Sequence, residues 1–243
     1  MITAPRAKVH KRAWKEFIKK HDIHKWIIAA ETGQGGYEHW QVRLDTSASF
    51  EEIQSAFPGA HIEKSTQWCD YERKEGKFVQ SGDNNLILSC RYGKLRKNQR
   101  RVIRELGRQS DRGVLIWYDP SGCCGKSWFI RHLYEVGKGL YVPPTLATVQ
   151  GIIQFVASSY RGQKYILVDI PRNSKWTSQL YEGLETLKDG LVYEARYHPD
   201  TKDIWGVKVL VTTNTLPKLD NLSRDRWTIV DRDGRIINEV SLP

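Results

Sequence analysis

The chain of 243 residues exceeds a typical domain of about 150 residues, so its length favours two domains of modest size. Hydrophobic residues make up 40% of the chain and aromatic residues 11%, which provides material for folded cores and excludes a disordered protein. No run reaches the roughly 18 apolar residues of a membrane span, and the basic start lacks the apolar segment of a signal peptide. We therefore expect a protein that is not secreted and has no membrane partner.

The net charge of +10 is spread unevenly along the chain. Residues 1–110 hold 21 Lys and Arg against 13 Asp and Glu, a balance of +8, whereas residues 111–243 hold 17 against 15, a balance of +2. Cationic side chains that contact phosphates gain affinity from the release of counterions. The excess indicates that the first half binds a polyanion, although a merely soluble basic surface would carry the same charge.

Residues 1–82 predict a small α+β domain built on an antiparallel sheet. Alternating or continuous apolar runs indicate strands, a glycine turn at 33–36 joins two of them as a hairpin, and Ser49 is placed to cap a short helix. We expect strands at residues 2–4, 26–30, 39–44 and 60–63, and helices at 9–21, after Ser49, and from about residue 65.

Residues 83–112 form a basic connector in this prediction. Eight Lys and Arg lie between Leu86 and Arg108, and helical spacing gives the segment an apolar side. That side consists of Leu95, Val102, Ile103 and Leu106. Two interpretations stay open: a solvated connector, or an element that contacts DNA or another subunit.

Strands and helices alternate after Gly113, which is typical of an α/β domain with a parallel sheet over residues 113–243. The polar segment 198–203 reads as the turn of a β-hairpin that precedes a central strand or merges into it. We expect strands at 114–118, 165–169, 192–197 and 204–213, and helices at 126–136 and 149–159.

The strand that ends at Tyr118 leads into a glycine-rich loop and then a helix. The loop contains Gly122-Cys123-Cys124-Gly125-Lys126-Ser127, whose glycines let backbone N–H groups surround phosphate oxygens. Lys126 would reach the terminal phosphates and Ser127 would ligate Mg²⁺, so the loop predicts binding of ATP with Mg²⁺. Pro120 stands where the usual pattern has its first glycine.

Two further strand ends supply partners for this loop. Asp169 ends a buried strand 43 positions after Lys126, where related enzymes hold Mg²⁺ through water, and Asn214 ends another strand. The residue after Asp169 is Ile170 instead of a second acid, which leaves the general base for hydrolysis unassigned.

A second set of polar residues lies in the first 82 residues. His39 and Gln41 alternate on one side of a strand, Trp40 faces the other side, and Glu31 ends the neighbouring strand. Their nitrogen and oxygen atoms suit Mg²⁺ or Mn²⁺. Tyr71 and Lys74 share a face if their segment is helical. Each of these residues taken alone also has an ordinary structural explanation.

These motifs, in this order, resemble the HUH endonuclease domain of replication proteins from circular single-stranded DNA viruses. The resemblance covers Ile2 to Arg6, Glu31 with His39-Trp40-Gln41, and Tyr71 with Lys74. It implies a rolling-circle replication initiator that nicks and joins a single-stranded origin stem-loop. Tyr71, assisted by Lys74, would form a 5′-phosphotyrosine. Gln41 and the run Trp117 to Pro120 are closest to smacovirus-like members.

The second half resembles the superfamily 3 helicases of small DNA viruses. The resemblance implies a homo-oligomer, expected to be a hexamer, that unwinds DNA with ATP. It also implies an arginine, Arg224 or Arg226, that acts on the nucleotide of the neighbouring subunit, and a DNA-binding turn around Lys202. The expected location is the nucleus of a eukaryotic host, or otherwise the cytoplasm.

Two other hypotheses compete with this one. The chain could be a P-loop ATPase whose first domain binds nucleic acid without cutting it. It could also be an inactive or structural homologue, as Pro120 and the missing acidic residue after Asp169 would suggest.

Overall fold

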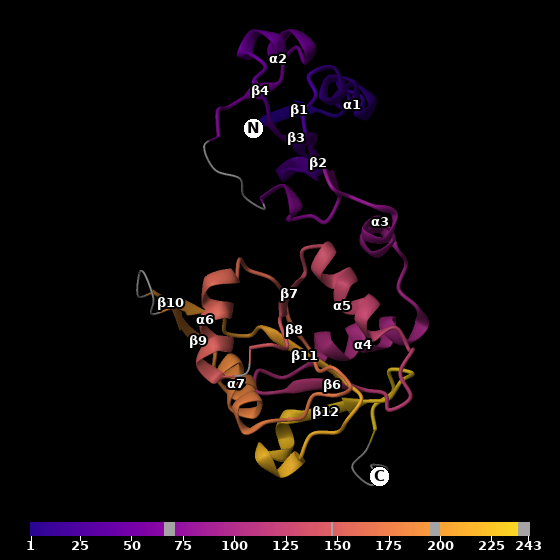
Figure 1. Ribbon diagram of the computed structural model, residues 1–243, viewed down its shortest axis with the longest axis vertical. Helices are drawn as coiled ribbons and strands as arrows, with labels where there is room; N and C mark the ends of the chain where they lie inside the picture. The colour runs from indigo at the N-terminus through magenta and orange to yellow at the C-terminus, as the bar shows by residue number, and fades with distance from the viewer. Residues whose placement is uncertain (66–70, 147, 195–199, 238–243) are drawn as a thin grey trace. The chain divides into compact units, whose positions relative to one another are not determined.

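The computed structural model describes residues 1–65, 71–146, 148–194 and 200–237, and the chain divides into two compact units (Figure 1). The first unit is Met1–Arg91 and the second is Tyr92–Pro243. The segment 83–112, predicted as a connector, forms two helices, α3 (Asn85–Tyr92) and α4 (Lys97–Arg108), on either side of this division. Among the described helices, none combines the length and the apolar character needed to cross a membrane.

The first unit is an α+β structure with one antiparallel sheet in the strand order β4-β1-β3-β2-β5. The predicted strands and the first two helices are confirmed, with ends that shift by a few residues. The elements are β1 (Ile2–Pro5), α1 (Lys11–Lys20), β2 (Lys25–Thr32), β3 (Glu38–Asp45), α2 (Phe50–Ala56), β4 (His61–Ile62) and β5 (Phe78–Gln80). The helix expected from about residue 65 falls largely on residues 66–70, outside the described ranges.

One face of this sheet packs against α1 and α2. Trp40 and Val42 of β3 point to that face and share a core with Trp14, whose ring stacks on Phe57 at a centroid distance of 3.8 Å. Ser49 begins α2 as predicted, because its side chain and that of Glu52 cap each other's backbone N–H groups. The other face carries the polar residues that alternate with this core, together with a small apolar cluster of Ile27, Ala29 and Phe78.

The second unit is an α/β structure with a five-stranded parallel sheet in the order β12-β6-β11-β8-β7. Side chains alternate between two cores, one shared with α4 and α5 and the other with α6 and α7. Besides α4, the elements are β6 (Val114–Tyr118), α5 (Lys126–Glu135), β7 (Gly139–Val142), α6 (Val149–Ser159), β8 (Tyr165–Asp169), α7 (Ser178–Asp189), β11 (Lys208–Thr213) and β12 (Trp227–Val230).

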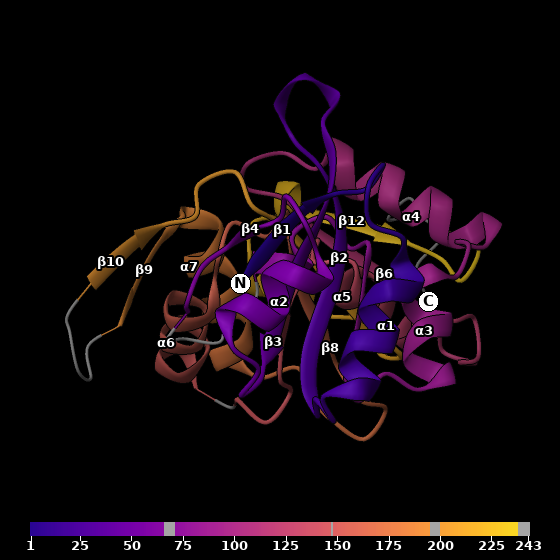
Figure 2. The same cartoon turned by 90° about the horizontal axis from the view of Figure 1, so that it is seen from above.

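The predicted hairpin is wrong in its second strand. β9 (Leu191–Glu194) pairs with β10 (Asp200–Asp203) as a separate two-stranded ribbon beside α6 and α7 (Figure 2). The strand expected at 204–213 begins only at Lys208, because Ile204 and Val207 are buried in the turn between β10 and β11. The four residues of β10 are all polar and so gave no apolar pattern to recognise. The sequence interpretation also lacked β5 in the first unit and β7, α7 and β12 in the second.

Candidate functional site

The polar face of the first unit brings Glu31 and His39 directly opposite each other on β2 and β3. His39 Nε2 lies 3.6 Å from Glu31 Oε2, and His39 Nδ1 lies 3.3 Å from the carbonyl oxygen of Tyr37. If Nδ1 carries the proton and donates it to that carbonyl, Nε2 presents its lone pair towards Glu31. In this tautomer Nε2 can act as a metal ligand.

Gln41 follows on the same face, two residues beyond His39. Its side chain is buried, and its Oε1 accepts a hydrogen bond from Thr3 Oγ1 at 2.8 Å, across the β1–β3 pairing. Trp40 points the other way and donates from Nε1 to the Val9 carbonyl at 2.6 Å. The strand therefore separates the polar side chains from the core as its alternation predicts.

Lys74 connects Tyr71 to this group. Tyr71–Arg73 is one turn of 3₁₀ helix, and Lys74 Nζ lies 2.8 Å from Glu31 Oε2 and 3.7 Å from the centre of the Tyr71 ring. Burial lowers the pKa of Lys74, but hydrogen bonds with Glu31 and Tyr71 raise it by more, so the net pKa is raised. Tyr71 is 51% exposed, which leaves it accessible to a substrate.

A buried ion pair fixes this turn to the sheet. Arg43 of β3 donates from Nε to Glu72 Oε1 at 2.8 Å and from Nη1 to Ser65 Oγ at 2.7 Å. Glu72 is 1% exposed and follows Tyr71 directly. Sequence reasoning missed this pair, although Arg43 continues the same-face series of His39 and Gln41.

The donor set fits a divalent cation. Among the described residues, Glu31 Oε1 is buried without a hydrogen-bond partner, which leaves an anionic oxygen for a cation. Within the same ranges no group of three His, Cys, Asp or Glu could hold a metal, so a site here needs the amide oxygen of Gln41 as its third ligand. An imidazole, a carboxylate and an amide suit Mg²⁺ or Mn²⁺.

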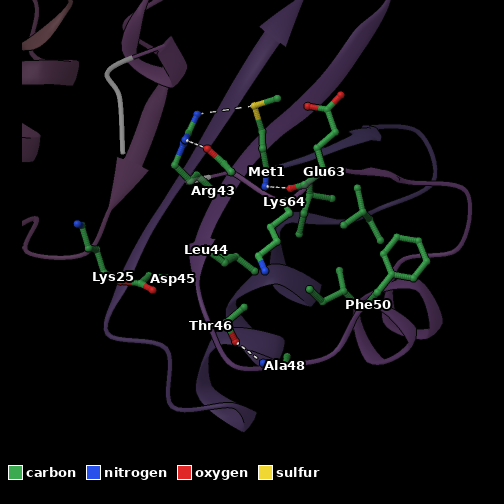
Figure 3. A pocket seen from close by; sticks show the side chains of 14 residues that line it. Met1, Lys25, Arg43, Leu44, Asp45, Thr46, Ala48, Phe50, Glu63 and Lys64 are labelled. Atoms are coloured by element: carbon green, nitrogen blue, oxygen red, sulfur yellow. Dashed lines mark hydrogen bonds between the residues drawn. The ribbon is translucent and has the colours of Figure 1, made fainter. Parts of the chain in front are cut away.

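A pocket of about 580 Å³ opens elsewhere on the first unit, where β1, β3 and β4 meet the start of α2 (Figure 3). Lys25 and Lys64 line it together with Phe50, whose ring is 56% exposed. Arg43 reaches this pocket as well as the turn that carries Tyr71.

The glycine-rich loop of the second unit joins β6 to α5. Three of its residues, Gly122, Cys123 and Gly125, have φ angles of 81°, 61° and 93°. These left-handed conformations are typical of a loop that turns its backbone N–H groups inwards. Lys126 begins α5, and its Nζ donates to the carbonyl oxygen of Asp119 at 3.2 Å. Ser127 follows at an exposed position.

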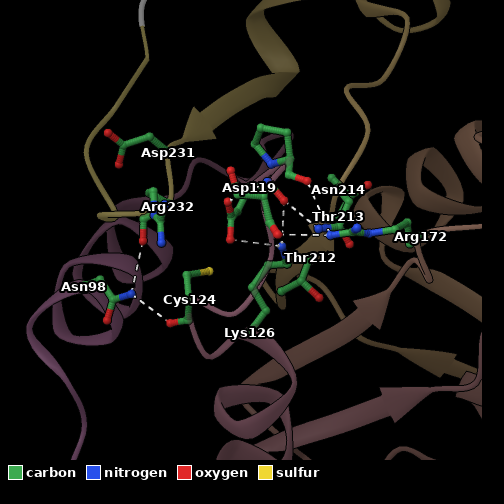
Figure 4. A network of polar contacts seen from close by, with 12 residues as sticks. Asn98, Asp119, Cys124, Lys126, Arg172, Thr212, Thr213, Asn214, Asp231 and Arg232 are labelled. Atoms are coloured by element: carbon green, nitrogen blue, oxygen red, sulfur yellow. Dashed lines mark hydrogen bonds and ion pairs between the residues drawn. The ribbon is translucent and has the colours of Figure 1, made fainter.

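Asp169 and Asn214 reach the same edge of the sheet as this loop. β11 pairs with both β6 and β8, so the residues that follow β11 lie between the loop and Asp169. Thr212 Oγ1 donates to Asp169 Oδ1. Asn214 Nδ2 donates to the Asp119 carbonyl at 2.6 Å (Figure 4). The parallel sheet thus brings together the three predicted groups, as carboxyl ends of parallel strands do.

The outer side of the loop is held by α4, which sequence reasoning treated only as a connector. Asn98 Nδ2 donates to the Cys124 carbonyl at 3.0 Å and Gln99 Nε2 donates to the Gly125 carbonyl at 3.1 Å. Burial and a hydrogen bond with Asp119 raise the pKa of the Cys124 thiol to about 11. Cys124 therefore packs as a neutral thiol in the base of the loop.

The predicted arginines and Lys202 lie apart from the loop. Arg224 is exposed and pairs with Asp220 at 3.0 Å, whereas Arg226 is buried and pairs with Glu185 of α7 at 3.0 Å. Lys202 lies on β10, not in a turn, and its Nζ donates to the Ala157 carbonyl at 2.6 Å. The sequence pattern did not indicate which groups these three cationic side chains would contact.

Comparison with known proteins gives one consistent result, although no family model matches the chain. The "Master replication protein" of Banana bunchy top virus is 25% identical over 272 aligned residues, which cover 88% of this chain and 93% of that protein. The protein of the same name from Subterranean clover stunt virus is 24% identical over 273 residues, with the same coverage. "Para-Rep C6" of Subterranean clover stunt C6 alphasatellite is 31% identical over 175 residues, 65% of this chain and 59% of that protein.

The chain, an antiparallel α+β unit followed by a parallel α/β unit with a glycine-rich loop, resembles the replication-associated proteins of circular single-stranded DNA viruses over most of its length. The names of these relatives support a replication enzyme. The closeness of the chain to smacovirus-like members stays a prediction.

Proposed function

We propose that this protein initiates rolling-circle replication by nicking and joining single-stranded origin DNA with Tyr71, and that its second unit hydrolyses ATP to unwind DNA. The observation that carries the proposal is the Lys74 ammonium, which lies between the Glu31 carboxylate and the ring of Tyr71. A nucleophile, a cation and a set of metal ligands are thus within reach of one phosphate.

The nicking step follows from these side chains. The Tyr71 phenol oxygen attacks a backbone phosphorus, the new O–P bond forms, and the bond from phosphorus to the 3′ oxygen breaks. The phenol proton is lost and the leaving 3′ oxygen gains one, which yields a 5′-phosphotyrosine and a free 3′-OH. The Lys74 ammonium attracts the phosphate electrostatically. Joining is the reverse reaction with a new 3′-OH.

Glu31, His39 and Gln41 would hold the Mg²⁺ or Mn²⁺ of this site, since Glu31 Oε1 has no partner among the described residues. A bound divalent ion supplies Lewis-acid polarisation of the phosphate. The hydrogen bond between His39 Nδ1 and the Tyr37 carbonyl orients the imidazole, and the one between Thr3 and Gln41 orients the amide. These contacts keep the ligands in place without the ion.

Single-stranded DNA is the proposed substrate because exposed Tyr71, with the Lys74 ammonium over its ring, is suited to attack a backbone phosphate. The pocket lined by Lys25, Lys64 and Phe50 offers cations for the backbone and a ring on which a base can stack (Figure 3). An origin stem-loop would present both a single strand and a phosphate for Tyr71.

The ATPase proposal rests on the loop from Gly122 to Ser127, with Asp169 and Asn214 at the same sheet edge. Lys126 would move from the Asp119 carbonyl to the nucleotide phosphates, and Asp169 would hold Mg²⁺. We propose a homo-oligomer, expected to be a hexamer, in which exposed Arg224 is the residue available to a neighbouring subunit. Arg226 is less suited because it is buried against α7.

Two variants of the full chain separate the activities. Tyr71→Phe should abolish the covalent protein–DNA adduct and retain ATP hydrolysis, whereas Lys126→Ala should abolish hydrolysis and retain the adduct. Adducts are measured on denaturing gels with labelled stem-loop DNA, and hydrolysis is measured by phosphate release. If Tyr71→Phe still formed the adduct, Tyr71 would not be the nucleophile. If the wild-type protein formed no adduct, an ATPase whose first unit only binds nucleic acid would be favoured.

A further inference from the structure

Arg172 follows β8 and contacts the glycine-rich loop between β6 and α5, which we call the phosphate loop. The chain leaves β8 after Asp169 as Ile170-Pro171-Arg172, and Arg172 Nη2 donates to the Ser121 carbonyl at 3.1 Å and the Pro120 carbonyl at 3.4 Å. Because β11 separates β8 from β6, this side chain reaches across the end of a strand (Figure 4). The motifs of the sequence did not include it.

The guanidinium lies directly over Gly122. A Cβ atom at this position would lie 2.9 Å from Nη2 of Arg172 and 3.9 Å from Nδ2 of Asn214. A larger residue would therefore displace the arginine, and the φ angle of 81° also favours glycine. The chain thus leaves room at Gly122 for two side-chain donors that come from two different strand ends.

Three donors converge on the segment from Asp119 to Gly122. Lys126 Nζ and Asn214 Nδ2 both donate to the Asp119 carbonyl, at 3.2 Å and 2.6 Å, and Arg172 donates to the next two carbonyls. Among the described residues, Arg172 donates only from Nη2, so Nε and Nη1 remain for another acceptor. A phosphate is a stronger acceptor for a guanidinium than a neutral carbonyl is.

We propose that Arg172 is a catalytic arginine that contacts the γ-phosphate of ATP bound to its own chain. The assignment rests on the proposed ATPase activity and adds to it a residue that no neighbouring subunit has to supply. When nucleotide enters the loop, the guanidinium exchanges the Pro120 and Ser121 carbonyls for phosphate oxygens a short distance away. Because the guanidinium already lies over Gly122, it needs no large movement to reach the phosphate.

Arg172 would stabilise the negative charge that develops on ATP oxygens during hydrolysis. A water oxygen forms a bond to the γ-phosphorus, and the bond from that phosphorus to the β–γ bridging oxygen breaks with its electron pair on ADP. One proton of the water passes to solvent and the other stays on the released phosphate. Negative charge on the bridging and γ oxygens increases before the bond breaks, and a guanidinium in place stabilises it.

Steady-state ATP hydrolysis and binding of a fluorescent ATP analogue with Mg²⁺ test the assignment in full-length variants. Arg172→Ala should lower kcat by at least about 100-fold and leave the analogue's Kd within about threefold of wild type. Arg172→Lys should stay well below wild type, because an ammonium lacks the planar fork of the guanidinium. Lys175→Ala, an exposed cation in the same loop, is the matched control and should hydrolyse ATP normally.

Mixing Arg172→Ala with Lys126→Ala protein tests whether the arginine acts within its own chain. No activity should return, because neither chain holds both an intact loop and Arg172. Restored hydrolysis would overturn the same-chain assignment.

A kcat for Arg172→Ala within about threefold of wild type would overturn the catalytic role, and so would loss of analogue binding, which would make Arg172 a residue that only shapes the loop. Failure of the wild-type protein to hydrolyse ATP would instead refute the proposed ATPase activity, and the role of Arg172 with it.

Discussion

The two oxygens of the Glu31 carboxylate have different surroundings. Oε2 lies 2.8 Å from the Lys74 ammonium and 3.6 Å from His39, whereas Oε1 is buried with no hydrogen-bond partner among the described residues. A buried anion in such a position is stable only while a cation compensates it. Lys74 provides that charge here, and a divalent ion can provide it too.

Lys74→Met should lower the melting temperature and make it more responsive to Mn²⁺. The variant leaves Glu31 without its ammonium partner, at a cost of about 1–3 kcal/mol. Bound Mn²⁺ would restore the compensation, so the melting temperature should rise more with Mn²⁺ in the variant than in wild type. Thermal unfolding with and without MnCl₂ measures this, with exposed Lys15→Met as control. An equal response in all three proteins would contradict a metal site at Glu31.

Lys188 of α7 makes the stability of the second unit depend on pH. Its ammonium is 3% exposed and donates to the Val207 carbonyl at 2.8 Å. Burial and then the charge of Lys208 lower its pKa from 10.5 to about 8. Between these two pH values the unfolded chain binds the proton that the folded chain has lost, so stability rises with pH.

Lys188→Met should therefore remove this part of the pH dependence. The free energy of unfolding of the wild type should rise relative to the variant from about pH 8 to about pH 10.5 and stay parallel to it below pH 8. Urea denaturation across this range measures both proteins. A difference that is constant above pH 8, or that falls, would be inconsistent with a lowered pKa.

At the level of elements, alternation and capping were enough to predict most of the fold. The face that β3 gives to His39 and Gln41, and the start of α2 at Ser49, follow from residue types a few positions apart. β10 could not be found because all four of its residues are polar, and the hold of α4 on the phosphate loop depends on amides far away in sequence.

The candidate site was predictable to a similar extent. The sequence placed Glu31, His39 and Gln41 on one face and Asp169 and Asn214 at one sheet edge, because strand geometry determines both. It did not predict Arg43, Glu72 or Arg172, since their roles arise from tertiary contacts between loops and strands.

The Arg43–Glu72 pair should position the turn that carries Tyr71. Arg43→Met leaves the Glu72 carboxylate buried and unpaired, which should destabilise the unit by about 3–5 kcal/mol and slow adduct formation. The double variant Arg43→Met/Glu72→Met removes both charges and should regain most of the stability but not the rate. Urea denaturation and adduct kinetics distinguish the two effects. A double variant as unstable as the single one would rule out the charge as the cause.

Over the whole molecule, the excess positive charge does not follow the proposed DNA-cutting residues. Residues 1–91, the first unit, hold 14 Lys and Arg against 12 Asp and Glu, a balance of +2, whereas residues 92–243 hold 24 against 16, a balance of +8. The difference from the sequence-based division arises because the basic helix α4 belongs to the second unit. Relatives named as replication proteins align with 88% of the chain, so the likeness extends over both units.

Covalent capture of DNA tests the central claim most directly. Wild-type protein is incubated with a labelled single-stranded stem-loop, with Mn²⁺ or with EDTA, and resolved on a denaturing gel. We predict a DNA–protein adduct that forms with Mn²⁺, is absent with EDTA, and yields the labelled DNA on a peptide containing Tyr71 after proteolysis. No adduct under either condition, or attachment to a residue other than Tyr71, would contradict the account.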